Sequence, residues 1–246
     1  MTGAGWAAAE RGTVAHLFVA SLDDRCTVDG PDGHHLQRVR RLRPGEEVTA
    51  ADGTGRWRRY VVADVPPGRV VLDARAEVRA EPEVRPALAL ALALTKQGLD
   101  AVVAGCTELG VVRFEPVRAA RSVVRWDDRR AQAAVARLRV IAREAAAQCR
   151  RARVPEVAPV ADLADLAARR DLVVADREGV TASALAEPAS GTWTVLVGPE
   201  GGLDAHEREV IGDRPRLAVG RHVLRAQTAP VAVAAALAER ARERPP

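Results

Sequence analysis

A glycine-rich loop near the C-terminal end of the chain has the residue types and spacing of a ligand-binding turn. The apolar run 194–197 ends in Gly198-Pro-Glu-Gly-Gly202, and Asp204 and Glu207 follow with the spacing of a capping box. A strand, a bare-backbone loop and a helix start form pockets at the carboxyl edge of sheets in α/β proteins. The loop matches neither GxGxxG nor GxxxxGK[ST], so the common dinucleotide and P-loop interpretations do not apply.

A second glycine-led loop, Gly220–Thr228, also follows an apolar run and precedes a helical pattern. Two such loops at neighbouring parallel strands could cradle one ligand with backbone N–H and C=O groups. For either loop alone, a tight turn between a strand and a helix is the simpler interpretation. The pair predicts a shared pocket.

The elements that must position these loops follow from the apolar periodicity after residue 86. Strands alternate with helices, which predicts an α/β fold with a mostly parallel sheet and helices on both faces. The Ala-Leu alternation of 88–94 is compatible with either a strand or a helix. The expected strands are 88–94, 111–117, 172–175, 192–197 and 216–219, and the expected helices are 99–109, 128–149 and 229–242.

The first part of the chain has short strands and turns instead. Strands are expected at 16–19, 57–65 and 69–72, and a helix at 34–42 should bury Leu36, Val39 and Leu42. Its other side carries arginines, so we expect a small β-barrel with one basic edge. The predicted organisation is a flexible tail at 1–12, a barrel at 13–80, a linker at 81–86 and a larger domain at 87–246.

The composition indicates which kinds of partner the protein could bind. The formal net charge is +4 and the pI about 9.6, and Lys96 is the only lysine, so arginine supplies the positive charge. Arginine suits phosphate recognition, although a compositional bias would give the same count. Three cysteines without CxxC spacing favour a reducing cytosol and no metal, and no run of about 20 apolar residues predicts a membrane span.

Five motifs in order give the chain a family resemblance. It resembles the bacterial 16S ribosomal RNA uridine-N3 methyltransferases of the SPOUT class, from about residue 15 to 240. An N-terminal PUA-like barrel is suggested by His34-His-Leu36 and the residues up to Gly45. The motifs are Thr107-Glu-Leu-Gly-Val111, Arg121-Ser-Val123, Gln148-Cys-Arg-Arg-Ala-Arg-Val-Pro155, Gly198-Pro-Glu-Gly-Gly202 and Val223-Leu-Arg225 with Thr228.

The resemblance implies a ligand and a topology. Members of this class bind S-adenosylmethionine in a deep C-terminal trefoil knot, an exception to the rule against threaded chains, and work as homodimers. The residues expected to hold the cofactor are Val197, Gly198, Glu200, Gly201, Gly202, Leu217, Val219, Gly220, Val223, Leu224 and Thr228. Glu200 could instead cap the following helix.

The resemblance also implies a partner, the 16S ribosomal RNA of the small subunit. Arg225 is expected to stabilise negative charge on the uracil ring, with a surface ion pair as the alternative. Phosphate contacts are expected from Arg38, Arg40, Arg41, Arg121, Arg151 and Arg153. Methylation of another RNA, or a non-catalytic role as an RNA-binding assembly factor, are the alternative functions.

Several positions depart from the family pattern. Gly105 and Ala147 replace a common lysine and glutamate, and His222 replaces an arginine. In the second loop, Ala226 and Gln227 stand where a Thr-Glu pair is usual. Gln227 keeps hydrogen-bonding capacity without the charge, so a carboxylate there cannot be essential in this chain.

Overall fold

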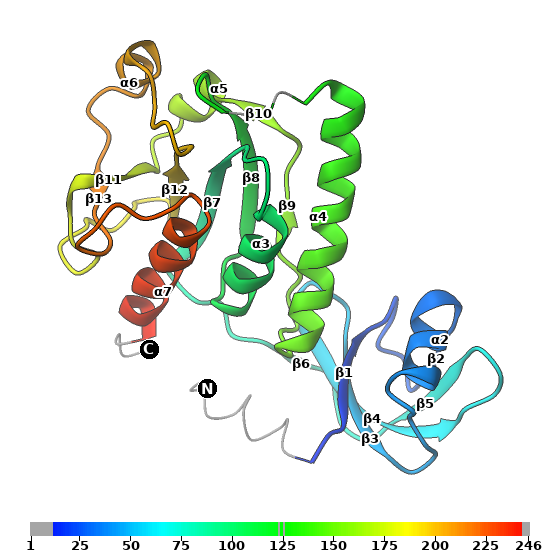
Figure 1. The fold of residues 1–246 in the computed structure, drawn as a ribbon. Helices are drawn as coiled ribbons and strands as arrows, with labels where there is room; N and C mark the ends of the chain where they lie inside the picture. Colours follow the sequence, from blue (N-terminus) through cyan, green and yellow to red (C-terminus); the bar gives the residue numbers. More distant parts are fainter. Residues whose placement is uncertain (1–11, 123, 125, 243–246) are drawn as a thin grey trace. The chain divides into compact units, whose positions relative to one another are not determined.

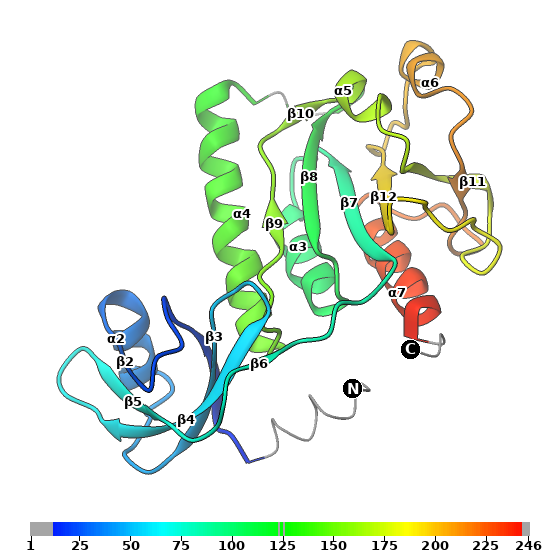
Figure 2. The same ribbon diagram turned by 180° about the vertical axis from the view of Figure 1, so that it is seen from behind.

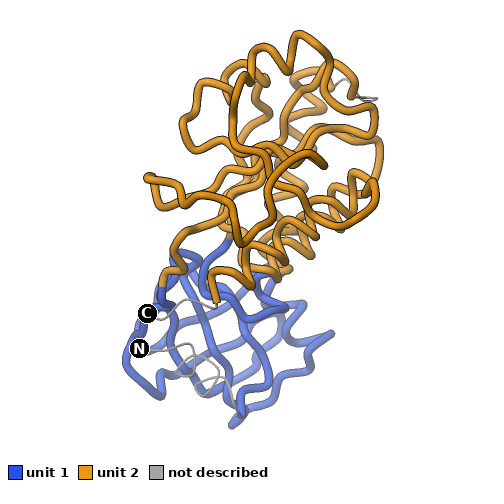
Figure 3. The backbone as a smooth tube through the Cα atoms, turned by 90° about the vertical axis from the view of Figure 1, so that its left-hand side faces the viewer, with its two compact units in different colours: residues 1–82, 146–154 blue, residues 83–145, 155–246 orange. Residues whose placement is uncertain are grey.

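Contacts within the chain divide it into two units, drawn in blue and orange in Figure 3. The computed structural model describes residues 12–122, 124 and 126–242. Unit 1 comprises the residues up to Pro82 together with 146–154, and unit 2 comprises 83–145 and the residues from Pro155 on. Most of the expected tail, and Val123 of one family motif, lie outside the described residues.

Unit 1 is built on a six-stranded sheet with the order β1-β3-β4-β5-β2, in which β6 also pairs with β4. Among the described strands of this unit, only β1 and β3 pair in parallel. Its core contains Tyr60, Val48 and Leu72, all fully buried. The elements are β1 (Ala15–Phe18), β2 (Arg25–Val28), α2 (Gly30–Arg38), β3 (Glu47–Ala51), β4 (Arg56–Asp64), β5 (Val70–Ala74) and β6 (Arg79–Ala80).

Helix α2 lies earlier in the chain than predicted. It begins at Gly30 with proline in its first turn, where proline is favoured, and it ends at Arg38. Arg41 has φ 52°, which a helix cannot contain. The prediction that Val39 faces the core was therefore wrong: its side chain is 65% exposed, whereas Leu36 and Leu42 are buried.

The segment 146–154 packs with unit 1 although the sequence pattern placed it in the larger domain. Ala146 and Ala152 pack with Phe18, Ala51 and Trp57 in one apolar cluster. The Arg150 side chain donates hydrogen bonds to the hydroxyl and carbonyl oxygens of Thr13, at 2.8 and 3.0 Å. These contacts are 137 positions apart in sequence, so no local pattern predicts them.

Unit 2 contains a seven-stranded sheet with the order β10-β8-β7-β12-β11-β13, and β9 also pairs with β8. Every strand pair is parallel, as predicted. Its elements are β7 (Ala87–Ala93), α3 (Leu99–Glu108), β8 (Arg113–Arg118), α4 (Asp128–Gln148), β9 (Glu156–Val157), β10 (Ala161–Asp162), α5 (Leu163–Ala167), β11 (Leu172–Val180), β12 (Thr192–Val197), α6 (Ala205–Ile211), β13 (Arg216–Leu217) and α7 (Thr228–Arg242).

Helices cover both faces of this sheet. The Ala-Leu alternation belongs to β7, whose leucines enter the larger core with residues of α3, α4 and α7. Figure 1 shows α3 and α7 side by side on that face. The other face packs Ala91 of β7 and Leu196 of β12 against α5 and α6. Figure 2 shows β8, β7 and β12 side by side from behind.

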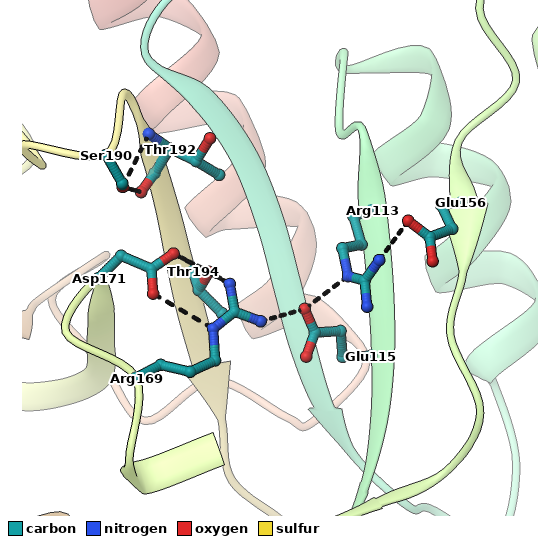
Figure 4. A network of polar contacts seen from close by, with 8 residues as sticks. All are labelled: Arg113, Glu115, Glu156, Arg169, Asp171, Ser190, Thr192 and Thr194. Carbon is teal, nitrogen blue, oxygen red and sulfur yellow. Dashed lines mark hydrogen bonds and ion pairs between the residues drawn. The ribbon is translucent and has the colours of Figure 1, made fainter. Parts of the chain in front are cut away.

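A network of charges lies on the second face, towards the amino-terminal ends of the strands (Figure 4). Glu115 Oε1 accepts hydrogen bonds from Arg113 Nε at 2.7 Å and Arg169 Nη1 at 2.5 Å. Arg169 also donates to both carboxylate oxygens of Asp171 and to the Thr194 hydroxyl. Because β7 presents small alanines between β8 and β12, long side chains fit across it. The network ties these strands together at the end away from the glycine loop.

Candidate functional site

A cavity of about 300 Å³ lies at the carboxyl edge of the sheet of unit 2. It is bounded by the glycine loop after β12, the loop before α7, the middle of β11 and one side of α6. The lining includes apolar and charged side chains and bare backbone. The residues are Val174, Ala175, Asp176, Arg177, Val197, Gly198, Pro199, Glu200, Gly202, Leu203, Arg208, Ile211, Arg216, Val223, Leu224, Ala226 and Ala229.

The glycine loop is fixed by the helix that follows it. Asp204 Oδ1 accepts from the Glu207 N–H at 2.7 Å, and Glu207 Oε2 accepts from the Asp204 N–H at 2.8 Å, so the predicted capping box is confirmed. Gly202 has φ 66°, a conformation that side chains rarely adopt. Because Asp204 is the cap, Glu200 is not needed there and lines the cavity instead.

The loop after β8 holds the glycine loop from the other side. Glu207 is buried, and its Oε1 accepts from the Ala120 N–H at 2.6 Å. Arg121 Nη1 donates to the Gly201 carbonyl oxygen at 3.0 Å, and a Cβ at Gly201 would lie 3.3 Å from that of Arg121. Arg121 therefore supports the wall of the cavity.

The second loop contributes the opposite wall. Gly220 has φ 75°, and the Leu224 side chain packs 3.6 Å from where its Cβ would be. The Arg225 carbonyl oxygen accepts the N–H groups of Thr228 and Ala229, which starts α7. Leu224 and Ala226 line the cavity, whereas the Arg225 side chain between them is exposed.

Gln227 fastens this second loop to the segment after β7. Its Nε2 donates to the Gln97 carbonyl oxygen at 3.1 Å, and the Thr95 hydroxyl donates to the same oxygen at 3.0 Å. Gly98 has φ 93°, and a Cβ there would lie 2.4 Å from Gln227 Nε2. The bond needs a donor at position 227, which an amide has and an ionised carboxylate lacks.

The charges of the cavity are of both signs. Asp176 and Glu200 are its acidic side chains, and Asp176 Oδ2 accepts from Arg216 Nη1 at 3.0 Å. The Arg208 side chain forms no ion pair within the part of the chain that the structure describes. The cavity therefore suits a ligand that carries both a cationic and an anionic group.

The structure brings together about half of the residues expected to hold a cofactor. Val197, Gly198, Glu200, Gly202, Val223 and Leu224 line the cavity. Leu217 is fully buried in the main core and Val219 packs against it. The backbone at Gly201, Gly220 and Thr228 shapes the two loops, but these residues do not themselves line the cavity.

The arginines expected to contact RNA fall into two groups. Arg38, Arg40 and Arg41 are exposed on unit 1, and Arg40 Nη2 donates to Gln148 Oε1 at 2.9 Å. In the second group, Arg121 donates to the Gly201 carbonyl oxygen and Arg153 donates to the Thr54 carbonyl oxygen at 2.6 Å. Arg151 is partly buried, and this burial lowers the pKa of its guanidinium.

Sequence reasoning missed the cavity residues outside the two loops. Asp176 and Arg177 follow the buried part of β11 and lie at the carboxyl edge because β11 runs parallel to β12. Because the sequence already predicted parallel strands, it could have placed Asp176 and Arg177 at this edge. Gly179 permits the approach of β13, since its Cβ would lie 2.4 Å from the backbone of Arg216. Arg208 and Ile211 come from α6, whose orientation required the structure.

Residues 12–122, 124 and 126–242 contain neither a metal-binding cluster nor a membrane-spanning helix. No group of three or more His, Cys, Asp or Glu side chains there could hold a metal ion. No helix among the described residues is both long and apolar enough to cross a membrane.

Comparison with known proteins identifies the class of protein to which the chain belongs. A family profile described as RNA methyltransferase domain matches residues 82–238, and one described as RNA methyltransferase PUA domain matches 28–74. The two profile matches identify the chain as an RNA methyltransferase with a PUA domain.

The relatives narrow the class to one family. The ribosomal RNA small subunit methyltransferase E of Mycobacterium bovis is 38% identical over 236 residues, covering 88% of each chain. The Neisseria gonorrhoeae enzyme of the same name, solved bound to S-adenosylmethionine, is 26% identical with a TM-score of 0.79, covering 91% of this chain and 96% of that one. A Legionella pneumophila protein solved with the same cofactor shares the fold, with 22% identity and a TM-score of 0.82 over 93% and 98% of the two chains. The chain belongs to the ribosomal RNA small subunit methyltransferase E family.

Proposed function

We propose that this protein transfers a methyl group from S-adenosylmethionine to N3 of a uridine in 16S ribosomal RNA. The observation that carries the proposal is the cavity between two glycine-led loops in a chain of this family. Relatives with the methyltransferase name and structures solved with the cofactor support it.

The cavity residues fit S-adenosylmethionine. The volume of about 300 Å³ lies at the lower end of the usual range for small-molecule sites. Apolar side chains such as Leu203, Ile211 and Leu224 suit an adenine ring. Asp176 and Glu200 can accept hydrogen bonds from hydroxyl or ammonium groups, and Arg208 can pair with a carboxylate. When bound, the cofactor supplies an electrophilic methyl group on a sulfonium.

The protein's own contribution is alignment and charge. Proximity and orientation can account for much of the lowering of the barrier. Uracil N3 must lose its proton before or during attack, and a cation near the ring oxygens favours the anion. We assign this role to Arg225, whose side chain is exposed between two cavity residues and forms no ion pair with the described residues.

Unit 1 and its arginines serve to dock the RNA through phosphate contacts, which should weaken as salt rises. The protein works in the cytoplasm as a homodimer. Val223, on the rim of the cavity, has 75% of its apolar side chain exposed, and a second copy would cover it. Analytical ultracentrifugation tests the dimer: a monomer at micromolar concentration would contradict it.

Nucleoside mapping of ribosomal RNA by mass spectrometry tests the proposed reaction. We expect N3-methyluridine at one position of 16S ribosomal RNA after incubation with the protein and S-adenosylmethionine, and none without the protein. A methylated nucleoside elsewhere would favour another RNA target. If calorimetry detects no binding of S-adenosylmethionine, a non-catalytic assembly factor is favoured.

The Gln227 contact gives a prediction on cofactor affinity. Gln227→Glu should weaken S-adenosylmethionine binding about 3- to 10-fold near pH 7.5, because a carboxylate cannot donate to the Gln97 carbonyl oxygen. A glutamic acid can donate once protonated, so the loss should shrink as the pH falls towards about 4.3. Calorimetry across this pH range measures both effects.

Gln97→Ala is the matched control, since the acceptor is its backbone oxygen and truncation of the side chain should leave the affinity unchanged. A pH-independent loss in Gln227→Glu would show that position 227 acts without the hydrogen bond.

A further inference from the structure

A second concave site lies in unit 1, between α2 and the turn that joins β4 to β5. The groove has a volume of about 450 Å³. Helix α2 supplies His34, Gln37 and Arg38 to its lining, and the turn supplies Gly68 and Arg69. The two parts are about thirty positions apart in sequence, so the fold creates the site.

The walls of the groove are held in a fixed relation. Gln37 Oε1 accepts from the Gly68 N–H at 2.9 Å, and Gln37 Nε2 donates to the Pro66 carbonyl oxygen at 3.4 Å. The backbones also approach closely, since a Cβ at Gly33 would lie 2.6 Å from the Gly68 carbonyl oxygen. Gly68 has φ 76°, and its Cβ would lie 3.0 Å from the His34 ring. The groove is therefore organised before any ligand binds.

Its cationic side chains are not used within the protein. Arg38 and Arg69 form no hydrogen bond or ion pair through their side chains with the described residues. Other arginines of unit 1 are engaged: Arg25 pairs with Asp73, and Arg58 with Asp24. His34 Nδ1 donates to the Gly30 carbonyl oxygen at 2.8 Å, which leaves its Nε2 without a partner among the described residues.

We propose that this groove binds a phosphate of the RNA backbone through Arg38 and Arg69. The inference rests on the proposed function and adds a site to it. Two guanidiniums that line one preformed concave surface suit the forked geometry of phosphate recognition. Asp29 is the one acidic side chain of the lining. A backbone contact of this kind fixes the register of the RNA and carries no sequence preference.

The double variant Arg38→Gln/Arg69→Gln tests the site in the full chain. Its affinity for a 16S ribosomal RNA transcript should fall about tenfold at moderate salt, and the slope of log K against log salt should become shallower by about 2. The matched control is Arg43→Gln/Arg75→Gln, which removes the same charge from two exposed positions of unit 1 outside the groove. The control should lose at most about twofold, since it removes only long-range attraction.

The possible outcomes distinguish failure of the groove proposal from failure of the proposed methyl transfer. Equal losses of RNA affinity in both double variants would overturn the proposal that the groove binds a phosphate. Loss of uridine monophosphate binding in the groove variant, with RNA affinity unchanged, would assign it to a free phosphate ester instead. S-adenosylmethionine affinity should be the same in all three proteins, which checks that the cofactor site is intact, and hydrogen exchange of the β1 and β3 amides checks that unit 1 is folded. If the unmodified protein binds RNA through the groove but does not methylate it, the proposed methyltransferase function is overturned and the proposed phosphate site in the groove stands.

Discussion

Arg225→Ala should lower the rate of methyl transfer at saturating RNA and cofactor by about 100- to 1,000-fold, the usual effect of removing a group that stabilises charge in a transition state. The side chain is exposed beside the cavity, between Leu224 and Ala226. Because it does not line the cavity, cofactor affinity should stay within about twofold. Single-turnover assays and calorimetry measure the two quantities.

The pH dependence distinguishes charge stabilisation from simple positioning. If Arg225 favours the uracil anion, the variant should regain activity as the pH rises, because hydroxide then removes the N3 proton. Arg225→Lys should recover part of the rate by restoring the charge. Arg221→Ala on the same exposed loop is the control and should keep nearly full activity. Full turnover by Arg225→Ala would exclude the role.

The parts of the site that sequence could predict are those that local chemistry determines. Gly198–Gly202, the capping box of Asp204 and Glu207, and the second loop each depend on neighbours within a few positions. The parallel sheet followed from the alternation of strands and helices. Parallel pairing then brought the two loops to one edge, where both line one cavity.

The elements that sequence missed depend on distant partners. Strand β3 reads Glu-Val-Thr-Ala-Ala, in which the glutamate and the two alanines disfavour a strand, yet it pairs with β1 and β4. Arg121, which the family resemblance assigned to RNA, donates a hydrogen bond to the Gly201 carbonyl oxygen 80 positions away, a contact that no local pattern predicts. The Glu115–Arg169 contact spans 54 positions. The trefoil knot stays a prediction.

Another long-range contact makes the stability of unit 1 depend on pH. His16 is buried, its Nε2 donates to the Arg151 carbonyl oxygen at 3.0 Å, and its Nδ1 accepts from the Thr49 hydroxyl at 2.8 Å. Burial lowers the pKa of His16 to about 4; the hydrogen bond to Arg151 opposes the shift and the charge of Arg150 adds to it. The buried ring is neutral at pH 7.

Acidification should therefore destabilise unit 1 between pH 6.5 and about 4. In this window the unfolded chain binds a proton at His16 that the folded chain does not, so the free energy of unfolding falls as the pH falls. A lowering from 6.5 to about 4 corresponds to a loss of about 3 kcal/mol. Hydrogen exchange of the β1 and β3 amides, corrected for intrinsic rates, reports this unit alone.

His16→Gln is the matched variant, because its amide can donate to Arg151 and accept from Thr49 but does not titrate. The pH slope of the β1 and β3 protection should flatten in this variant, whatever its stability at pH 7. Equal slopes in the two proteins would mean that His16 is already protonated in the fold, or that other groups control the acid transition. The flattened slope is the stronger test, since a change in packing alone shifts stability equally at every pH.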